Sequence, residues 1–377
     1  MQKSIGIISL SKIASDGRVL RQIEYLSRQY DVVVIGYGEA PDYLLKSSNI
    51  HWHEIKLCKQ PIFRSLQTVA ARLLQIPFFP MTHEATRIAI ESRCDAYHAN
   101  NWDALPAAAI AARTHGSKLV MDIHESYDTW YWGLSKGIIR FVFQKFSSYV
   151  DSSTTVVQQI ADQHQEFGLN PIVLRNIPEI PAEPITLKKT DGRKIRLISH
   201  GVASKERRND LMIKTLALCD SRYELHLVFT NFKSAYVTGL RKLAEKITPG
   251  RVFFHPPYAP KEIVSNIMRF DVGIHPIAPT SYNNIIALPN KFFEFIAAGL
   301  AVCIGPSPSM AEIVKEYHCG VIATSFEAAD IAEVLNRTTA AQWDEMKQAS
   351  LRASQELNAD HEMKKLIDIY QYLFRQS

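Results

Sequence analysis

The chain alternates between short apolar runs and segments in which apolar residues recur every three or four positions. The first run, "SIGIISL", reads as a strand; "VLRQIEYLSRQ" reads as a helix and "YDVVVIGYG" as a second strand. Apolar strands joined by amphipathic helices are typical of a parallel β-sheet covered on both faces. The pattern therefore predicts an α/β protein.

The same alternation runs through the first half of the chain, stops, and begins again. Further strands are predicted at "DAYHAN", "SKLVMDIHE" and "SSTTVV", with helices near residues 103–114 and 135–148. After a proline-rich, charged stretch at 176–194, strands are predicted at "KIRLISHG", "YELHLVF", "RVFFH" and "DVGIHPI", with helices near 207–219, 234–247 and 260–269. Prolines and charges without periodicity fit an exposed connector. The chain therefore reads as two Rossmann-like lobes.

These patterns divide the chain into four predicted parts. They are an N-terminal Rossmann-like domain at residues 1–178, a linker at 179–192, a C-terminal Rossmann-like domain at 193–357 and a terminal helix at 358–377. The terminal segment has helical apolar periodicity and is expected to pack back on the N-terminal domain. Open parallel sheets bind ligands outside the carboxyl ends of their strands, and two lobes that face each other form a cleft.

Composition narrows the class of protein. The hydrophobic share of 46% and the charged share of 21% are typical of a soluble globular chain, which is expected in the cytoplasm. The cysteines have no CxxC pair, so neither a disulfide framework nor a zinc site is indicated. The net charge of +5 suits an anionic small molecule or an anionic membrane surface. Nucleic acid is not expected as a partner, because the positive charge is spread rather than gathered with stacking aromatics.

One helix of the second lobe carries charge among apolar residues. In "LPNKFFEFIAAGLAVCIG", Pro289 suits the first helical position, and the free N–H groups of the first turn, that of Asn290 among them, point out of a loop. A helix start favours a phosphate, and Lys291 adds a full positive charge. Glu294, one turn on, is placed to accept hydrogen bonds from a ribose diol. A nucleotide diphosphate fits both; a solvated ion pair is the alternative.

A second basic segment, "HGVASKERRNDLMI", follows the first strand of the second lobe. Gly201 ends the strand, and the loop carries Lys205, Arg207 and Arg208. One planar guanidinium here can hold a diphosphate from the side opposite Lys291. Three neighbouring cations cannot all point inward, so at least two of the three are expected to be solvated.

The first lobe offers residues at the carboxyl ends of its own strands. "KLVMDIHESYD" places His124 and Glu125 just beyond a strand, where an imidazole can donate to a sugar hydroxyl or the carbonyl can stabilise developing positive charge. The loop "KIASDGRV" supplies Asp16, Gly17 and Arg18, and Gly17 permits close approach of a ligand. A structural histidine at 124 and a helix cap at Asp16 are the alternatives.

Several chemistries lack their sequence signatures. The chain has no GxSxG, HExxH, GxxxxGK[ST] or GxGxxG motif, so esterase, zinc protease, P-loop and ordinary dinucleotide sites are not indicated. No Asp-x-Asp pair occurs, which argues against a carboxylate-held metal at the diphosphate. We therefore expect no metal and no cofactor, and expect cationic side chains and a helix dipole to hold the ligand.

The segment "LPNKFFEFIAAGLAV" followed by "SMAEIVKEYHCGVI" resembles the donor-site block of retaining GT-B glycosyltransferases, especially of family 4. That block has a P-x-K-x-x-E-x-x-A-x-G pattern before a strand and a helix. "SDGRVLRQIEYL" resembles the group's first helix, "MDIHESY" its D-x-H-E segment, "IVLRNIPE" the end of its first lobe and "HGVASKERRNDLMI" its phosphate loop. The resemblance spans nearly the whole chain and implies a GT-B fold, in which two Rossmann-like domains face a central cleft.

Carried over position by position, the resemblance assigns roles to the candidate residues. It implies that Glu294 binds the ribose, that Arg207 and Lys291 bind the diphosphate, and that His124 contacts the donor sugar near the reacting carbon. The expected donor-binding set is Gly17, Gly201, Arg207, Asn290, Lys291 and Glu294, and the expected catalytic set is His124, Arg207 and Lys291.

The chain departs from the family pattern at two positions. The sugar-contacting glutamate often found eight residues before Glu294 is Ile286 here, and the arginine often found directly after Gly201 is Val202. Contacts to the donor sugar must therefore come from elsewhere, and backbone N–H groups of "NNIIAL" are candidates.

The resemblance implies a metal-independent, retaining, hexosyltransferase-type enzyme. It would move a sugar from a UDP- or GDP-linked donor to an acceptor hydroxyl, in bacterial cell-surface polysaccharide or glycolipid assembly. The leaving diphosphate is stabilised by positioned charges, and in this family it is thought to help remove the acceptor's proton. A nucleotide-sugar epimerase of GT-B-like fold and a non-catalytic two-lobed binding protein are the alternative functions.

The acceptor is less constrained by the sequence. Two basic, amphipathic segments of the first lobe, residues 55–80 and 129–146, either lie on an anionic membrane or form core helices with solvated lysines. The first possibility would place the protein at the inner face of the cell membrane and give access to a saccharide or lipid-linked saccharide acceptor.

Overall fold

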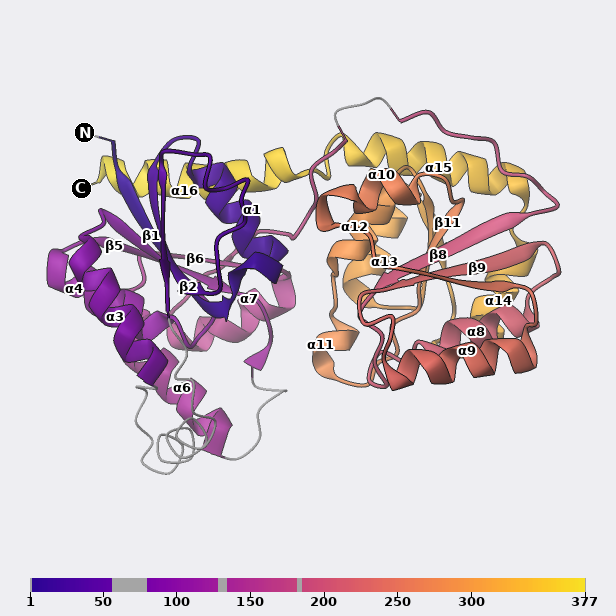
Figure 1. The fold of residues 1–377 in the computed structure, drawn as a ribbon, viewed down its shortest axis with the longest axis horizontal. Coiled ribbons are helices and arrows are strands. Elements are labelled where there is room, and N and C mark those ends of the chain that lie inside the picture. Colours follow the sequence, from indigo (N-terminus) through magenta and orange to yellow (C-terminus); the bar gives the residue numbers. More distant parts are fainter. Residues whose placement is uncertain (1, 56–79, 128–133, 182–184, 377) are drawn as a thin grey trace. The chain divides into compact units, whose positions relative to one another are not determined.

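The computed structural model of the chain describes residues 2–55, 80–127, 134–181 and 185–376. They form two compact units (Figure 1). Unit 1 comprises Met1–Arg175 together with Met363–Ser377, and unit 2 comprises Asn176–Glu362. The chain therefore leaves unit 1, builds unit 2, and returns to complete unit 1 with its last helix.

Unit 1 is built on a parallel sheet with the order β3-β2-β1-β4-β5-β6-β7 among the described strands. These strands are β1 (Ser4–Lys12), β2 (Asp31–Tyr37), β3 (Ile50–Glu54), β4 (Ala96–Asn100), β5 (Lys118–Ile123), β6 (Ser152–Thr155) and β7 (Ile172–Val173). Strand order reverses between β1 and β4, where the loops diverge and open sheets of this kind bind ligands. The carboxyl ends of β1, β4 and β5 are therefore where a site is expected in this unit.

Helices connect and cover these strands. They are α1 (Gly17–Leu26), α3 (Pro80–Ser92), α4 (Leu105–His115), α6 (Leu134–Phe146), α7 (Gln158–His164) and α16 (Ala359–Arg375), with short 3-10 turns η1 (Ile13–Ser15), η2 (Ser147–Tyr149) and η3 (Gln165–Phe167). Figure 1 shows α3 and α4 on one side of the strands and α1 on the other. Right-handed crossovers that run in opposite directions from β1 place their helices on opposite faces in this way.

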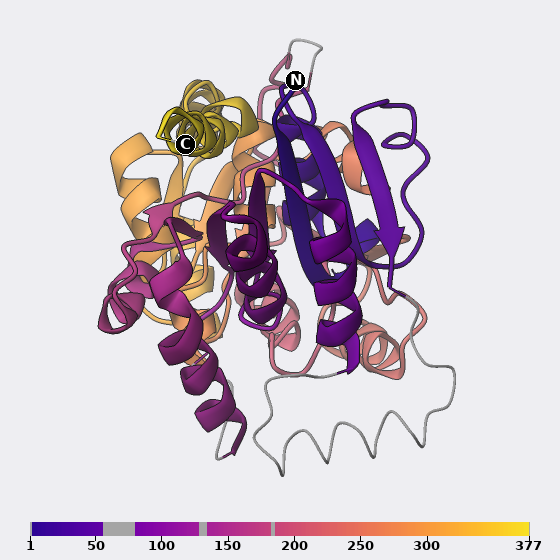
Figure 2. The ribbon, with the colours of Figure 1, turned by 90° about the vertical axis from the view of Figure 1, so that its left-hand side faces the viewer.

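The C-terminal helix α16 joins unit 1 through a buried contact. Tyr370 on α16 is fully buried, and its hydroxyl lies 2.8 Å from Nδ1 of His98 on β4. Near the other terminus, Lys3 Nζ lies 5.5 Å from the ring centroid of Phe374. Figure 2 shows both chain ends on this unit.

Unit 2 has a parallel sheet of the order β10-β9-β8-β11-β12-β13, the same winding as unit 1. Its strands are β8 (Ile195–Gly201), β9 (Tyr223–Phe229), β10 (Val252–His255), β11 (Val272–His275), β12 (Ala301–Ile304) and β13 (Gly320–Ile322). Its helices are α8 (Asp210–Leu218), α9 (Ala235–Ile247), α10 (Ile263–Ile267), α11 (Tyr282–Ile285), α12 (Asn290–Ala297), α13 (Pro308–Tyr317), α14 (Ala328–Arg337) and α15 (Ala340–Ser354), with η4 (Pro260–Glu262). Here the strand order reverses between β8 and β11.

Each face of the unit 2 sheet has its own hydrophobic core. One core packs α8, α9 and α14 and includes the buried Trp343; the other packs α10, α12 and α13 and includes Phe292 and Phe295. β11 and β12 are buried along their whole length, which explains why their sequences are mostly apolar. The α/β, doubly wound fold class predicted from the sequence is confirmed in both units.

Two helices of unit 2 are shorter than their sequence pattern suggested. α8 begins at Asp210 rather than near residue 207, because Arg208 has a positive φ of +48° that a helix cannot include. Residues 260–269 divide into η4 and the short α10 rather than one helix. The loop after β8 is therefore longer than expected, and it keeps Arg207 outside the helix.

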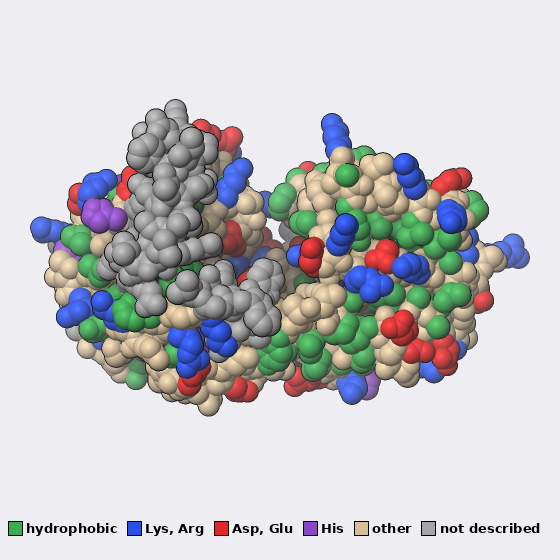
Figure 3. All heavy atoms as spheres, turned by 90° about the horizontal axis from the view of Figure 1, so that it is seen from below, with side chains coloured by type: hydrophobic (Ala, Val, Ile, Leu, Met, Phe, Trp, Pro, Cys, Tyr) green, Lys and Arg blue, Asp and Glu red, His purple; other side chains and the backbone are tan. Residues whose placement is uncertain are grey.

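No helix among the described residues is long and apolar enough to cross a membrane. On the face of the molecule shown in Figure 3, basic side chains lie interspersed with acidic ones. The predicted amphipathic segment at residues 55–80 lies almost entirely outside the described residues, as does the first part of the segment at 129–146.

Candidate functional site

The candidate site of unit 2 lies at the carboxyl end of β8, which closes with Gly201. This residue has a φ of +115°, in a region that favours glycine. A Cβ added to it would lie 3.2 Å from Lys291 Nζ and 4.0 Å from Arg207 Nη1. The missing side chain leaves the space that these cations occupy, so the structure brings Gly201, Arg207 and Lys291 together.

Helix α12 carries Lys291 to this point because it lies close on the sheet. Its residues Phe292, Phe293 and Phe295 are buried in the core on that face. The strand beneath has Gly273, and a Cβ there would overlap the ring of Phe295. Only glycine at this position lets the helix approach so closely, and the close approach holds the first turn of α12 at the ends of β8 and β11.

The two ends of α12 differ in how they are capped. Pro289 is the N-cap with extended backbone, so the helix begins at Asn290, one residue later than predicted. No described side chain caps the first turn, which leaves its N–H groups and their partial positive charge at the site. At the other end Gly299 has a φ of +69°, and the N–H of Leu300 donates to the carbonyl of Phe295 at 3.0 Å. The predicted glycine cap is confirmed there.

Lys291 is a buried cation. Its relative exposure is 8%, so the alternative of a solvated surface pair with Glu294 is wrong. Burial and the nearby charge of Arg207 lower the pKa of Lys291 to about 7, while Glu294 acts in the opposite direction. An ammonium group with little water around it gains strongly from an anion. The position is therefore suited to a phosphate oxygen.

Two histidines lie beside these charges, at the ends of β8 and β11. Nε2 of His200 is 3.3 Å from Oε2 of Glu294, and both side chains are largely buried. Burial, with the charge of Lys291, lowers the pKa of His200 to about 3, and burial with Lys291 and other nearby cations holds the pKa of His275 well below its usual range. Both imidazoles are neutral at physiological pH. His200 opens the segment "HGVASKERRNDLMI" and His275 lies in "DVGIHPI", but neither was predicted as a site residue.

Of the basic residues in the loop after β8, Arg207 is the one whose guanidinium approaches Gly201. Nε of Arg208 lies 3.3 Å from the carboxylate of Asp210, and Lys205, Arg207 and Arg208 are all exposed. This agrees with the expectation that at least two of these three cations are solvated.

Two polar side chains that the sequence did not single out hold this loop in place. Asn231 accepts the N–H of Ala203 at 2.9 Å and donates to the carbonyl of Ala203 at 2.8 Å. The hydroxyl of Thr280 donates to the carbonyl of Glu206 at 2.8 Å. The loop is thereby anchored on the side of β9 and on the side of β11.

The two departures from the family pattern have different structural settings. Ile286 is buried, with 4% exposure, so it presents no group to a ligand. Val202 is 46% exposed beside Gly201. Neither side chain offers the charge that the family often has at that position.

In unit 1 the start of α1, which follows β1, reaches a buried carboxylate near the end of β5, Asp122. Arg18 binds it through Nε and Nη2, each at 2.6 Å; Thr154 donates at 2.7 Å and Gln22 at 2.6 Å. Burial alone would raise the pKa of Asp122, but Arg18 and His124 hold it well below its usual range. Arg18 is therefore a structural partner of Asp122, an arrangement that the sequence motif did not reveal.

His124 lies directly beyond β5, as predicted, and is oriented by its neighbours. Its Nε2 is 3.0 Å from Oδ2 of Asp122 and 3.1 Å from Oδ1 of Asn100. Both partners are acceptors, so Nε2 carries the hydrogen and Nδ1 faces away from them. The imidazole is thus held in one orientation by a charged and a neutral acceptor.

Gly17 lies at the first position of α1, next to its cap. Asp16 accepts the N–H groups of Arg18 and Val19 at 3.2 Å each, so the cap alternative for Asp16 is correct. A Cβ built on Gly17 meets nothing within 4 Å among the described atoms. The space over Gly17 is open, which leaves room for the close ligand approach that we predicted.

A further group of polar residues gathers at the ends of β4 and β5. Burial raises the pKa of Asp103 to about 6, and His124 acts against this rise. Nearby, the hydroxyl of Tyr127 donates to Oδ1 of Asn101 at 2.6 Å. The sequence contained a signal, since "NWD" directly follows the strand "DAYHAN".

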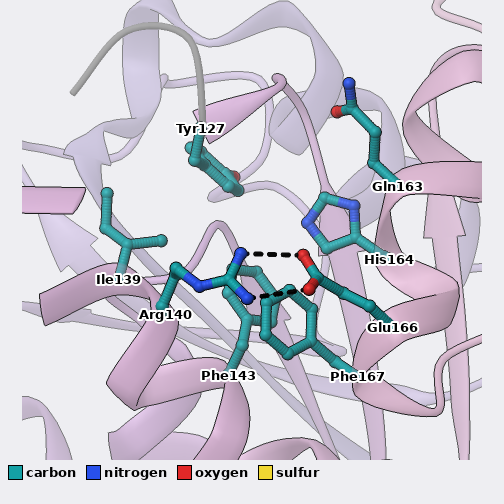
Figure 4. Close-up of a pocket in the computed structure, with 8 residues that line it drawn as sticks. All are labelled: Tyr127, Ile139, Arg140, Phe143, Gln163, His164, Glu166 and Phe167. Carbon is teal, nitrogen blue, oxygen red and sulfur yellow. Dashed lines mark hydrogen bonds and ion pairs between the residues drawn. The ribbon is translucent and has the colours of Figure 1, made fainter. Parts of the chain in front are cut away.

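A small cavity of unit 1, about 10 Å³, lies between α6 and α7 (Figure 4). That volume holds about one water molecule. Its polar side chains already pair with each other: Arg140 binds Glu166 through two hydrogen bonds of 2.9 and 2.8 Å. Nδ1 of His164 lies 2.8 Å from the carbonyl of Ile160 in its own helix. The cavity therefore lacks both the room and the unpaired charge for a nucleotide.

Within the part of the chain that the structure describes, no group of three or more His, Cys, Asp or Glu side chains is arranged to hold a metal ion.

Residues 18–181 match the family model Glycosyltransferase Family 4. No curated protein sequence matches the chain. Among solved structures, Anabaena HepE in complex with UDP and glucose superposes with a TM-score of 0.71 at 19% identity, over 98% of this chain and 100% of HepE.

Two other solved structures are similar over nearly their full length. The lipopolysaccharide outer core galactosyltransferase WaaB has a TM-score of 0.67 at 12% identity, covering 98% of this chain and 99% of WaaB. A protein of Listeria monocytogenes described as a UDP-N-acetylglucosamine 2-epimerase has a TM-score of 0.62 at 11% identity, covering 100% and 98%. The resemblance to GT-B glycosyltransferases and the GT-B fold predicted from the sequence are confirmed.

Proposed function

We propose that this protein is a retaining, metal-independent glycosyltransferase that moves a sugar from a nucleoside diphosphate sugar to an acceptor hydroxyl. The observation that carries the proposal is the convergence of Gly201, Arg207, Lys291 and Glu294 at the ends of β8 and β11. Lys291 and Arg207 offer two cations for a pyrophosphate, and Glu294, one helical turn after Lys291, offers a carboxylate for a ribose. The Glycosyltransferase Family 4 match and the fold shared with UDP-bound HepE support it.

The pyrophosphate would be held by three kinds of positive charge. Arg207 offers a planar fork of donors, Lys291 a compact ammonium group, and the uncapped start of α12 its N–H groups. Glu294 would accept hydrogen bonds from the ribose hydroxyls. The UDP complex of HepE makes UDP the first nucleotide to test, with GDP as the alternative.

The same charges would serve the reaction. As the bond between the anomeric carbon and the diphosphate oxygen breaks, negative charge grows on the leaving oxygen, where Arg207 and Lys291 stabilise it more strongly than in the donor. The acceptor oxygen then bonds to the anomeric carbon on the face that the diphosphate leaves, and its proton passes to the leaving phosphate. His124 stays the predicted contact of the donor sugar.

Substitutions at this site test the proposal directly. Glu294→Ala should weaken UDP binding about 10- to 100-fold, because a hydrogen bond to a charged group contributes about 1.5–3 kcal/mol. Arg207→Ala should lower kcat/KM about 100-fold or more, the usual effect of removing one positioned charge. Isothermal titration with UDP and GDP and a transfer assay with UDP-glucose and related donors measure these effects. Wild-type affinity in both variants would refute the assigned roles.

Product analysis separates this function from its alternatives. A glycosyltransferase releases UDP and leaves the sugar on an acceptor or, without one, on water. An epimerase of the kind named for the Listeria relative would instead convert the nucleotide sugar into its isomer. A binding protein would leave the nucleotide sugar unchanged.

We further propose a lipid-linked or saccharide acceptor in cell-surface polysaccharide or glycolipid assembly, with peripheral contact at the inner face of an anionic membrane. The similarity of the fold to WaaB, a lipopolysaccharide outer core galactosyltransferase, supports this kind of acceptor. On α6, Phe141 is 42% exposed and Lys145 Nζ lies 5.6 Å from its ring, which is the basic, apolar character that an anionic bilayer binds.

Sedimentation with vesicles tests the membrane contact. The protein should bind phosphatidylglycerol vesicles more strongly than phosphatidylcholine vesicles, and Phe141→Ser should reduce that binding. Tyr372→Ser, at an aromatic of 62% exposure on α16, is the matched control. Equal binding to the two lipids, or equal losses in the two variants, would contradict the proposal.

A further inference from the structure

An imidazole without an aligned hydrogen bond lies beside the predicted ribose carboxylate. Nε2 of His200 is buried and has no hydrogen-bond partner among the described residues. Oε2 of Glu294 lies 3.3 Å from it. A buried N–H that stays unpaired costs about 1–3 kcal/mol, so this group gains from a small closing movement of the carboxylate. Hydrogen bonds of this kind often tighten only when the ligand is bound.

Burial and a ring contact hold the imidazole of His200 in place. His200 is the next-to-last residue of β8, is 5% exposed, and meets Phe295 edge-to-face with ring centroids 5.3 Å apart. Phe295 follows Glu294 directly on α12. A glutamate side chain loses about 1.5–2 kcal/mol of rotamer entropy when it is ordered, and a rigid donor beside it reduces the cost that the ligand must supply.

The charge state of His200 suits this role. Burial first, and then the charge of Lys291, lower the pKa of His200 to about 3, so the ring is neutral and has one N–H. The titratable groups that face the ring are Lys291 and Glu294 from α12 and His275 from β11. Because the carboxylate of Glu294 lies 3.3 Å from Nε2, we place the hydrogen on Nε2. A neutral donor orients Glu294 without cancelling the negative charge that attracts the ribose hydroxyls.

We propose that His200 is a positioning residue: its Nε2–H donates to Oε2 of Glu294 and holds the carboxylate toward the 2′,3′-diol of a nucleoside diphosphate. The inference rests on the proposed donor function and explains how its ribose contact is ordered. His200 then contributes to the binding free energy only through Glu294, and only when the ligand has ribose hydroxyls.

The experiment is a double-mutant cycle measured with two ligands. Dissociation constants for UDP and for 2′,3′-dideoxy-UDP are determined by titration calorimetry for the wild type, His200→Leu, Glu294→Ala and the double variant. His200→Leu should weaken UDP about tenfold, which corresponds to about 1.4 kcal/mol, and change dideoxy-UDP less than about twofold. The double variant should bind UDP as weakly as Glu294→Ala alone, within about twofold, because the two residues act as one unit.

Two further variants separate positioning from simple loss of a buried histidine. His200→Gln keeps an N–H near the place of Nε2 and should recover most of the UDP affinity; it also serves if His200→Leu fails to fold. His226 on β9 lies at the same distance, 3.3 Å, from its own glutamate, Glu224. His226→Leu removes a matched pair that does not face Lys291, and should leave the ratio of the UDP and dideoxy-UDP affinities at its wild-type value.

The outcomes that overturn the inference differ from those that overturn the proposed function. If His200→Leu weakens UDP and dideoxy-UDP equally, or if its effect adds fully to that of Glu294→Ala, His200 does not act through the ribose carboxylate. If Glu294→Ala loses the preference for UDP over dideoxy-UDP but His200→Leu keeps it, the donor site stands and the role of His200 fails. If the wild type binds neither UDP nor GDP, the donor function fails and the inference fails with it.

Discussion

The buried side chain of Lys291 makes the stability of the folded protein depend on pH. In the folded protein burial and Arg207 lower its pKa to about 7, from an ordinary value of 10.5. Between these values the unfolded chain binds more protons than the folded one. Stability therefore rises with pH across this window, and below pH 7 the protein bears the full cost of the buried charge.

Lys291→Met should remove this dependence. The wild type should gain up to about 1.4 kcal/mol of unfolding free energy per pH unit between pH 7.5 and 9.5 relative to the variant, because one proton separates the two states. Urea denaturation at several pH values measures the difference. Parallel stability curves for the two proteins would show that Lys291 is not the titrating group.

Gly201 is a second residue at which one substitution is expected to change both stability and binding. Gly201→Ala should cost about 1–3 kcal/mol of stability, because alanine does not easily adopt a φ of +115°. It should also weaken UDP binding about tenfold or more, since its Cβ would lie 3.2 Å from Lys291 Nζ and must displace it. Thermal unfolding and calorimetry measure the two effects.

Gly239, exposed in the middle of α9 with no described atom within 4 Å of an added Cβ, provides the control. Gly239→Ala should stabilise the protein by about 0.5–1 kcal/mol and leave UDP affinity unchanged, because it only removes a helix-weakening glycine. Equal behaviour of the two alanine variants would contradict the role given to Gly201.

At the scale of elements, the site depends on how closely α12 rests on its sheet. Gly273→Ala should force Phe295, and with it the first turn of α12, away from β11. We expect a loss of about 1–3 kcal/mol from overpacking, together with weaker UDP binding, although residue 273 touches no ligand. Denaturation and UDP titration of the same preparation test both effects. A variant that is destabilised but binds UDP normally would mean that the helix position does not control the site.

The elements themselves were predictable where apolar pattern and length agreed. "YELHLVF" is β9 over the predicted residues, because its apolar positions alternate with Glu224 and His226 before the apolar end of the strand. β3, "IHWHE", was missed because it is a short edge strand with mostly exposed side chains, in which only Ile50 and Trp52 are apolar. The start of α8 was misplaced because the positive φ of Arg208 has no signature in residue type.

Some residues of the candidate site were likewise predictable from the sequence, and others were not. Lys291 and Glu294 were predictable because helical spacing brings them onto one face, and Gly201 because glycine at a strand end marks unusual backbone. His200, Asn231 and Thr280 were not, since they reach the site from separate strands and loops through packing that no local pattern encodes. The contact between His200 and Glu294 joins residues far apart in the chain, as does the ion pair between Arg18 and Asp122.

At the scale of the whole molecule, the last helix belongs to the unit that the chain builds first. The buried hydrogen bond between Tyr370 and His98 is one measure of this attachment. Tyr370→Phe leaves Nδ1 of His98 without its partner and should destabilise unit 1 by about 1–3 kcal/mol, the cost of an unpaired buried polar group. Urea denaturation measures the loss of stability. UDP binding reports on unit 2, so unchanged UDP affinity would assign the loss to unit 1.

Tyr372→Phe is the control for that variant. Tyr372 is 62% exposed on the same helix, and removal of its hydroxyl should change stability by less than about 0.5 kcal/mol. If Tyr370→Phe behaves like Tyr372→Phe, the hydrogen bond to His98 does not contribute to the attachment of α16.

The return of the chain to unit 1 also sets the order in which the protein matures during synthesis. Domains usually complete their folding from the N-terminus as the ribosome releases them. Here unit 1 includes Met363–Ser377, so all residues of unit 2 are synthesised before unit 1 is complete. Until then, the surface of unit 1 that α16 covers stays exposed. The half of the protein translated first is therefore the last to be finished.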